Sequence, residues 1–538
     1  MLKKMFAVCV GAGSLLFIVL LPMLSPAAKT KSVAPSAAIS PEICYDCHGE
    51  IRELKEKSKH AKLSCETCHG KLREHLANYE QKPATIIDQS LCGKCHQNEL
   101  KGLMTVNYQA QARKEKGVPT GRSPMMDKLL EPYGFTFEHN EPRSHVFMVT
   151  DQFVVDRFAG GRYQYKNGWH GVYETGRTWE VLEDTGKTLQ ETAKAGNPTC
   201  IQCKTSDHIL TWKFMGDKDP AAKWDRSSNV QEVAKATNNP MGCIHCHDPH
   251  GGQPRIVRDA LIKEVALNGS KMFAGKNGKT DLTVVDFRGF RKIGIQGKAD
   301  SRMMCAQCHV EYACGPGYEF DSGKKIGFDD QRTNHFPLTG PKELLAHYKN
   351  QNFYDFKHAV TGARLIKLQH PEAETFFGSI HDRNGVSCSD CHMPPMKDAS
   401  GKTYRNHGVI RPLHDVKAAC MRCHSKSTVQ KKLYEIETIQ NYIRGKMRKS
   451  EYWLGRLIDT YEAAKRMGVA ESTLAQAREK HEEAHVLWEW WTAENSDGFH
   501  NPELARETLA ASISASKAGV ALLNKAMTGQ STVEEKKK

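Results

Sequence analysis

The sequence predicts a mainly α-helical fold with little β-sheet, long helices near the C-terminus and a core that polypeptide alone does not fill. From about residue 428, apolar residues recur at helical spacing, as at Ile436, Ile439 and Ile443. Sustained strand alternation is hard to find elsewhere in the chain. Sixteen of the 18 cysteines fall into eight Cys-x-x-Cys pairs. Three of these pairs crowd into residues 44–96, which leaves little polypeptide to build a core around each one.

Seven of the eight pairs are followed at once by His. Cys-x-x-Cys-His is the attachment signature of c-type haem, in which two thioethers hold the porphyrin and the His ligates iron. A disulfide or zinc scaffold does not require His or Lys directly after every pair. We therefore predict a mainly α multihaem cytochrome c with a haem-dominated core and eight covalently bound haems. The haem-binding residues are Cys44, Cys47, His48, Cys65, Cys68, His69, Cys92, Cys95, His96, Cys200, Cys203, Lys204, Cys243, Cys246, His247, Cys305, Cys308, His309, Cys388, Cys391, His392, Cys420, Cys423 and His424.

The motif Cys200-Ile-Gln-Cys203-Lys204 ends in Lys instead of His. An ammonium group cannot ligate iron, so Lys204 must bind as the neutral amine, a form that Lys adopts when it is desolvated. Haems that only conduct electrons are usually filled on both sides by two His. We interpret the other seven haems as electron wiring and the Lys204 haem as the place where a small molecule meets iron.

Residues 1–28 predict a secretory signal peptide, with a basic start, an apolar run over 5–24 and small residues near Ala27 and Ala28. The apolar run is long for a signal, so an uncleaved N-terminal membrane anchor is the alternative. Residues 29–40 form a linker rich in Pro, Ala, Ser and Lys. Covalent haem is assembled outside the cytoplasm, and a bacterial periplasm is the expected location.

The formal net charge of +14 does not predict nucleic-acid binding. Each ferric haem adds about one positive charge at the iron core and two propionates. Eight haems therefore subtract about 8 charge units when oxidised and about 16 when reduced. Because the cofactors neutralise most of the Lys and Arg excess, we expect no nucleic-acid partner.

The motif spacing divides the mature chain into consecutive regions. Residues 41–105 form an N-terminal three-haem module for electron entry. Residues 106–427 form the catalytic five-haem core, whose haem-free stretch 106–199 builds one wall of the active cavity. Residues 428–530 form a helical region with expected oligomer contacts, and residues 531–538 are a charged tail.

Within the C-terminal region, Gly468 is expected to end one helix and Ser472 or Thr473 to cap the next. Asn501-Pro502 offers a further N-cap with Pro at the first turn. Trp488, Trp490 and Trp491 are too many large aromatics for an open surface. We expect them to pack against haems or against a neighbouring subunit.

Several motifs in a fixed order carry a family resemblance. The Lys204 motif is followed by Cys-His-Val-Glu311-Tyr312, then by Lys367-Leu-Gln369-His370-Pro371, and then by Gly378-Ser-Ile-His381 ahead of the Cys388 motif. The run from Pro142-Arg143-Ser-His145 to Arg157 fits as well. Over residues 140–510 the chain resembles the ammonia-forming cytochrome c nitrite reductases.

Two departures from the common five-haem form of that family matter. Three additional haem motifs precede the matched region, so the chain is more similar to the octahaem nitrite reductases. Cys314 follows Tyr312 by two residues, and in those enzymes the corresponding Tyr and Cys are joined by a thioether. The alternative for Cys314 is an idle buried thiol.

The resemblance implies that Arg157, Tyr312 and His370 surround the open face of the Lys204 haem. Arg157 would hold an anion, while His370 and Tyr312 would donate protons and hydrogen bonds. Arg143 is the rival for the role of Arg157, because this chain has a longer insertion before Lys204. Taken outside the matched run, His370 could equally be a distal haem ligand.

The same resemblance implies a calcium ion beside this pocket. Glu311 would bind through its carboxylate and Gln369 through its amide oxygen, and Tyr312 and Lys367 through their backbone carbonyls. A set made only of oxygens suits a hard cation.

Four distal haem ligands are implied in the same way: His145 for the His309 haem, His407 for the His247 haem, His500 for the His392 haem and His381 for the His424 haem. The three N-terminal haems have no such assignment. The histidines that compete for them are His60, His75, His170, His208 and His250.

The resemblance implies six-electron reduction of nitrite to ammonium, with hydroxylamine, nitric oxide and sulfite as further substrates. The electron donor would be a small cytochrome or a membrane quinol dehydrogenase, and the assembly a homo-oligomer, based on trimers or dimers. One alternative is an oxidative octahaem enzyme similar to hydroxylamine oxidoreductase, but that family keeps His at its catalytic haem. The other is a pure electron carrier, which needs no open iron.

Overall fold

The computed structural model describes residues 38–105, 125–130, 144–148, 198–275 and 277–535. The expected signal peptide and most of the linker lie outside them. In these ranges, no helix combines the length and the apolar character that crossing a bilayer would need. The chain forms two compact units: one runs from the first described residues to Pro41 and includes Ser64–Thr85, and the other combines Glu42–Leu63 with Ile86 onward.

The smaller unit carries the Cys65 haem motif. The motif lies on the 3₁₀ turn η1 (Cys65–Thr67) and on β1 (His69–Gly70), and α3 (Leu72–Ala77) follows. Strand β1 pairs antiparallel with β2 (Ala84–Thr85), which sets His69 opposite Thr85. The His69 Nδ1 and Thr85 Oγ1 atoms are 3.2 Å apart.

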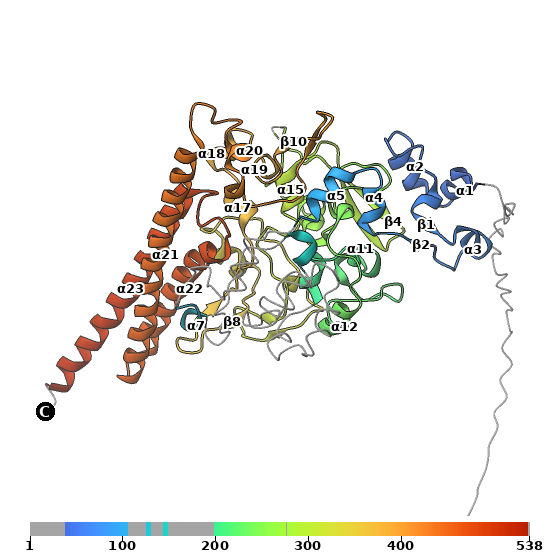
Figure 1. Cartoon of the computed structure of the whole chain (residues 1–538). Helices are drawn as coiled ribbons and strands as arrows, with labels where there is room; N and C mark the ends of the chain where they lie inside the picture. The colour runs from blue at the N-terminus through green and yellow to red at the C-terminus, as the bar shows by residue number, and fades with distance from the viewer. Residues whose placement is uncertain (1–37, 106–124, 131–143, 149–197, 276, 536–538) are drawn as a thin grey trace, which may run out of the picture. The chain divides into compact units, whose positions relative to one another are not determined.

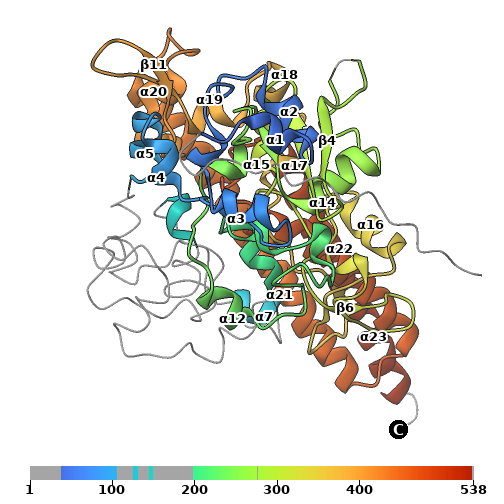
Figure 2. The same cartoon turned by 90° about the vertical axis from the view of Figure 1, so that its right-hand side faces the viewer.

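Three long helices end the larger unit, as the apolar periodicity predicted: α21 (Val429–Arg466), α22 (Glu471–Ala493) and α23 (Pro502–Glu535). They pack along one another (Figures 1 and 2). Gly468 follows the end of α21 with a φ of +75°, a conformation that Gly adopts without strain. The Oδ1 atom of Asn501 accepts a hydrogen bond from the Leu504 amide (3.2 Å) and caps α23.

One expectation for this region is wrong, and one of the two alternatives expected for the tryptophans is excluded. Helix α22 begins at Glu471 with Ala470 at the N-cap, so Ser472 and Thr473 lie in its first turn instead of capping it. Trp488, Trp490 and Trp491 are at most 1% exposed within this single chain, which excludes contact with a neighbouring subunit. The Trp490 indole donates to Thr375 Oγ1 (2.8 Å), a residue of α17 (Glu372–Phe376). The tryptophans thus fix α22 to the segment that follows His370.

Most haem motifs of the larger unit lie at the ends of short helices. These helices are α1 (Pro41–Tyr45), α4 (Gln89–Gly93), η6 (Pro198–Cys203), α13 (Cys243–Cys246), α15 (Ser301–Cys305), α19 (Cys388–His392) and α20 (Val416–Cys420). A turn of helix holds the two thiols and the following side chain close together. The remaining short elements are α2 (Gly49–Lys55), α5 (Gln97–Leu103), α7 (Met126–Leu129), η2 (His145–Phe147), α11 (His208–Thr211), η7 (Phe214–Gly216), α12 (Val230–Lys235), η8 (Lys263–Leu267), η9 (Gln331–Thr333), α16 (Leu344–Asn350), α18 (Ile380–Arg383) and η10 (Pro412–His414).

Sheet structure is sparse, as predicted, but the sequence analysis missed one three-stranded antiparallel sheet. Its order is β3 (Arg255–Ile256), β5 (Arg291–Gln296) and β4 (Leu282–Phe287), and Arg255 lies opposite Ile295. Helix α14 (Asp259–Ile262) packs against β5. The other strands of the larger unit form two-stranded ribbons: β6 (Gly317–Tyr318) with β7 (Lys325–Ile326), β8 (Phe356–Lys357) with β9 (Arg364–Leu365), and β10 (Pro395–Lys397) with β11 (Thr403–Arg405).

Candidate active site

Lys204 follows directly on the 3₁₀ helix η6, and a neighbouring loop fixes its backbone. The Lys204 carbonyl accepts a hydrogen bond from the Met241 amide (2.9 Å), and Thr205 pairs with Pro240. The Lys204 Nζ atom donates to the Cys200 carbonyl (2.9 Å) and therefore lies over its own motif. The loop that fixes Lys204 leads straight into the Cys243 haem motif.

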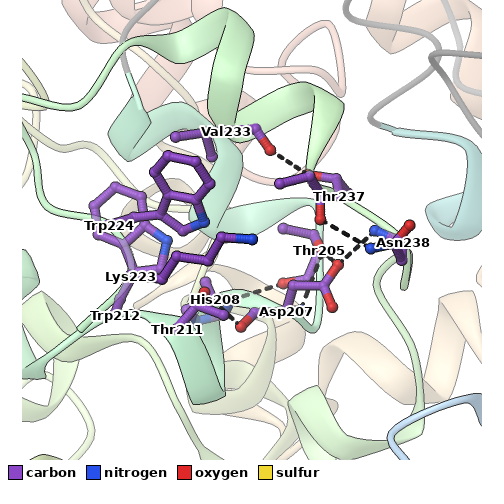
Figure 3. A pocket seen from close by; sticks show the side chains of 11 residues that line it. Thr205, Asp207, His208, Thr211, Trp212, Lys223, Trp224, Val233, Thr237 and Asn238 are labelled. Carbon is purple, nitrogen blue, oxygen red and sulfur yellow. Dashed lines mark hydrogen bonds between the residues drawn. The ribbon is translucent and has the colours of Figure 1, made fainter. Parts of the chain in front are cut away.

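Asp207 fixes this loop from the other side. Its carboxylate accepts hydrogen bonds from the amides of Asn238 (2.7 Å) and Asn239 (2.9 Å). Behind it lies a cavity of about 130 Å³, with the Trp212 and Trp224 indoles opposite Asp207 and Asn238 (Figure 3). The cavity lining includes neither Tyr312 nor His370, so this cavity is not the predicted catalytic pocket.

Tyr312 is buried (4% exposed), and its ring lies 5.7 Å from that of Phe336. Burial raises the pKa of the Tyr312 phenol well above its ordinary value, and the nearby Cys203, Cys314 and Cys200 thiols add to this. The phenol is therefore neutral and can donate a hydrogen bond. Ala313 pairs with His335 as in a strand. Side chains two residues apart on a strand share a face, so Tyr312 and Cys314 point to the same side.

The Lys204 and His309 motifs lie side by side. The Cys203 thiol is 3.9 Å from the Gln307 carbonyl, and the Cys308 thiol is 3.8 Å from the Cys203 carbonyl. The hydrogen bond with Cys308 lowers the pKa of the Cys203 thiol to about 5. The His370 ring lies 6.5 Å from the His309 ring. Tyr312 therefore lies beside the Lys204 motif, near the Cys200 and Cys203 thiols. His370 lies beside the adjoining His309 motif, at a ring separation that a distal ligand of the His309 haem would also have.

One residue of this region was missed by the sequence analysis. Arg258 is 2% exposed, and its guanidinium carbon lies 5.8 Å from the Tyr312 ring centroid and 5.5 Å from that of Phe336. Its Nε and both Nη atoms have no hydrogen-bond partner among the described residues. No sequence signal distinguished this Arg from the others. Arg157 and its rival Arg143 lie outside the described residues.

Glu311 is fully buried, with Oε1 accepting from the Tyr348 hydroxyl (3.2 Å) and Oε2 from the Gln369 amide (2.7 Å). The side-chain amide of Gln369 lies 3.0 Å from the Lys367 carbonyl. The oxygen and nitrogen of this Gln369 amide can be exchanged by rotating the group by 180°. In the rotated form, the Gln369 amide oxygen and the Lys367 carbonyl oxygen lie together beside Glu311. Burial raises the pKa of Glu311 well above its ordinary value.

A hard cation fits this oxygen set, because Glu311 is adjacent to a second buried acid. The Glu374 carboxylate accepts from the Glu311 amide (3.0 Å), and burial also raises the pKa of Glu374. Within the described ranges, no cluster of three or more His, Cys, Asp or Glu could hold a metal ion. The predicted calcium set needs only one carboxylate, so it is not such a cluster.

The structure brings together all four predicted pairs of proximal and distal histidines. Iron binds imidazole nitrogen at about 2 Å, so two ligands on opposite faces of a haem have ring centroids roughly 6 Å apart. The centroid distances are 6.3 Å for His145 with His309, 6.3 Å for His247 with His407, 6.3 Å for His392 with His500, and 6.4 Å for His381 with His424. The Nδ1 atom of His309 contacts Glu372 (3.3 Å), which leaves its Nε2 to face a metal.

A fifth pair was not assigned from the sequence: the His60 and His96 rings lie 6.4 Å apart. The Pro249 carbonyl, 2.9 Å from His60 Nδ1, holds that nitrogen and turns Nε2 away from it. The other described competitors have different neighbours. The His75 ring lies 6.0 Å from that of Tyr79, the His208 ring lies 5.2 Å from that of His245, and His250 contacts Asp248. His170 lies outside the described residues.

Thiols from different motifs also meet. The Cys92 thiol interacts with the Cys243 thiol, and the Cys305 thiol interacts with the Cys388 thiol. Together with the contact between Cys203 and Cys308, these links place haem motifs next to one another in pairs. Haems attached to these motifs would therefore lie next to one another, with the Lys204 haem beside the His309 haem.

The family model for cytochrome c552 matches residues 97–537. The chain belongs to the cytochrome c552 family. The match begins one residue after His96, so the three N-terminal haem motifs precede the part shared with the family model.

Curated relatives in the cytochrome c552 family are distant. The cytochrome c nitrite reductase subunit NrfA of Nitratidesulfovibrio vulgaris is 26% identical over 414 residues, which cover 72% of this chain and 66% of the relative. A cytochrome c-552 of Bacteroides fragilis is 27% identical over 383 residues, 71% of this chain and 64% of the relative. The chain thus spans a little less than two thirds of the length of these relatives.

A solved structure is also similar. The cytochrome c nitrite reductase of Desulfovibrio desulfuricans, described with two calcium sites in its catalytic subunit, superposes with a TM-score of 0.55 at 24% identity. The alignment covers 76% of this chain and 78% of that one. The fold is therefore that of the multihaem cytochrome c nitrite reductases, as the mainly α multihaem prediction requires.

Proposed function

We propose that this cytochrome c552 relative is a periplasmic octahaem nitrite reductase that reduces nitrite to ammonium at the Lys204 motif. The observation that supports the proposal is that Tyr312 lies beside the one haem motif that ends in Lys, with His370 beside the adjoining His309 motif. Hydroxylamine, nitric oxide and sulfite are further proposed substrates. The named nitrite reductases among the relatives support the reaction class.

When bound, the Lys204 haem would supply electrons and a metal centre for nitrite. The protein supplies protons, positive charge and confinement. Tyr312, neutral because it is buried, donates a hydrogen bond to a nitrite oxygen. His370 delivers protons to the departing oxygen atoms, and Arg157 holds the anion. Cys314 fixes the position of the Tyr312 ring.

The remaining seven motifs supply the electrons. We propose bis-His ligation by the four predicted pairs and by His60 with His96, on the basis of their ring separations. Electrons would enter through the 41–105 module from a small cytochrome or a quinol dehydrogenase and pass along neighbouring haems. A homo-oligomer, based on trimers or dimers through residues 428–530, completes the proposal.

Anaerobic product analysis tests the reaction. With reduced viologen as donor, the haem-loaded protein should convert nitrite stoichiometrically to ammonium, and nitrite should shift the spectrum of a high-spin haem. An electron carrier would instead give six-coordinate spectra that nitrite does not change, and no ammonium. That result would reject the enzymatic proposal.

Calcium removal should lower both activity and stability. When the free ion concentration is 100 times the Kd, binding stabilises the folded protein by about 2.7 kcal/mol. A chelator that removes the ion should therefore lower the melting temperature by several degrees. Added Ca²⁺ should restore the melting temperature and the rate of ammonium formation. In a Glu311→Gln variant the chelator should have a much smaller effect on melting, and an equal effect in both proteins would contradict this site.

A thioether between Tyr312 and Cys314 is expected, since both side chains share one face of an extended segment. Joining the phenol ring to the thiol removes two protons and two electrons, and two ferric haems would accept the electrons, one each. Mass analysis of the proteolytic peptide that holds both residues should therefore give a mass lower by two hydrogen atoms. The Cys314→Ala variant should lack that difference, and an unmodified wild-type peptide would disprove the crosslink.

A further inference from the structure

Three buried arginines interact electrostatically with one another, but only two of them form an ion pair with a carboxylate. Arg255 lies 3.5 Å from Asp248, and Arg291 lies 2.6 Å from Asp259. Arg258 is as deeply buried as the other two, yet neither its Nε nor its Nη atoms have a hydrogen-bond partner among the described residues. One guanidinium in this cluster is left without a hydrogen-bonded counter-charge among the described residues.

Burial cannot remove this charge, because a guanidinium stays protonated in proteins. Burial alone would lower the pKa of Arg258, but the surrounding Cys203 thiol and Asp259 outweigh it and raise the pKa. An unpaired buried charge is strongly unfavourable, and proteins avoid it by pairing the charge. The loaded protein should therefore bring an anion to this position.

The backbone of Arg258 is tied to a haem motif. The Val257 and Arg258 amides donate to Gln307 Oε1 at 2.6 and 3.2 Å, and Gln307 lies inside the Cys305 motif. The guanidinium interacts electrostatically with the thiols of Cys203 and Cys308. Arg258 is thus held where the Lys204 and His309 motifs meet, beside the Tyr312 ring.

We propose that Arg258 binds a planar anion with two oxygens at the Lys204 motif. A guanidinium offers two parallel N–H donors, which match two oxygens on one central atom. The flanking rings of Tyr312 and Phe336 exclude water from its faces. Two sources have this chemistry: the carboxylate of a haem propionate, and nitrite itself. If the partner is nitrite, the inference rests on the proposed function and adds a substrate-binding residue to it. If the partner is a haem propionate, the inference is independent of the proposed function.

The test compares the haem-loaded wild type with two variants. Arg258→Met removes the charge at similar side-chain volume, and Arg258→Lys keeps the charge but loses the two parallel N–H donors. An exposed-cation control, Lys402→Met, should match the wild type. Midpoint potentials are measured by optical redox titration without nitrite. Binding of nitrite and of uncharged hydroxylamine is then measured by spectral titration of the oxidised proteins.

A propionate partner predicts a shift in the midpoint potential of one haem in Arg258→Met without nitrite, with equal effects on nitrite and hydroxylamine. A nitrite partner predicts nitrite binding weakened roughly tenfold or more and unchanged hydroxylamine binding, whereas the loss of a buried positive charge beside the haem motifs lowers the midpoint potential in both cases. In either case Arg258→Lys should fall between the wild type and Arg258→Met. A propionate infrared band with the signature of a guanidinium pair, in a wild-type protein that forms no ammonium, would refute the proposed function and still support the propionate pair.

Unchanged potentials together with unchanged nitrite binding in Arg258→Met would overturn the inference. If that variant does not accumulate with haem, Arg258→Gln takes its place with the same two readouts. Infrared difference spectra of the wild type, recorded with ¹³C-labelled propionates and with ¹⁵N-nitrite, need no variant. Carboxylate and nitrite bands that both lack the signature of a guanidinium pair would equally overturn it.

Discussion

Replacing Lys204 with His should leave the haem attached and slow nitrite reduction on the order of 100-fold or more. Cys200 and Cys203 remain in the variant, so the thioether attachment is unaffected. The axial ligand sets the electronic properties of haem iron, and changes even one shell further from a metal commonly cost 10- to 100-fold. The Lys204 side chain also lies over its own motif, with Nζ 2.9 Å from the Cys200 carbonyl, and a shorter rigid imidazole cannot take the same path.

Ammonium formed from nitrite with reduced viologen measures the effect, beside the haem content from pyridine haemochrome spectra. Lys223→His is the matched control: Lys223 lies 5.1 Å over the Trp224 ring, in the wall of the separate cavity, and its change should leave the rate unaltered. A Lys204→His protein with full haem content and the wild-type rate would show that the identity of this ligand does not matter.

The features that the sequence predicted well are local in the chain. Haem motifs are five-residue patterns, and the helical spacing of residues such as Ile436 and Ile443 lies within one helix, α21. The missed sheet needs pairing between segments, as between Arg255 and Ile295. No short sequence pattern predicts such a pairing. Whether two segments pair as strands depends on which other parts of the chain cover the two faces of the sheet.

Contacts between distant segments account for the other differences. The Trp490 indole contacts Thr375, which is 115 residues away. The sequence could indicate that this Trp is buried, but not which segment of the chain buries it. Five histidines competed for the N-terminal haems, and only the folded chain brings His60 within 6.4 Å of His96. Arg258 is an ordinary Arg in the sequence. It becomes distinctive only because the neighbouring acids pair with Arg255 and Arg291.

Replacing His370 with Asn should lower the rate of ammonium formation by about 100- to 10,000-fold, the range that general acid catalysis contributes. Asn has a similar size and can still donate a hydrogen bond, but it cannot release a proton at neutral pH. Nitrite should therefore bind nearly as tightly as in the wild type, while turnover collapses. Steady-state kinetics and spectral titration with nitrite separate these two effects.

His414→Asn is the control for this change, because His414 lies on the 3₁₀ turn η10 and has no role in the proposed reaction. Its rate should match that of the wild type. A Tyr312→Phe variant should also be slow, and the double variant should lose less than the product of the two single losses, since both groups serve one proton delivery. If His370→Asn kept the full rate, protons would have to reach nitrite through Tyr312 and solvent alone. Tyr312→Phe would then carry the whole loss.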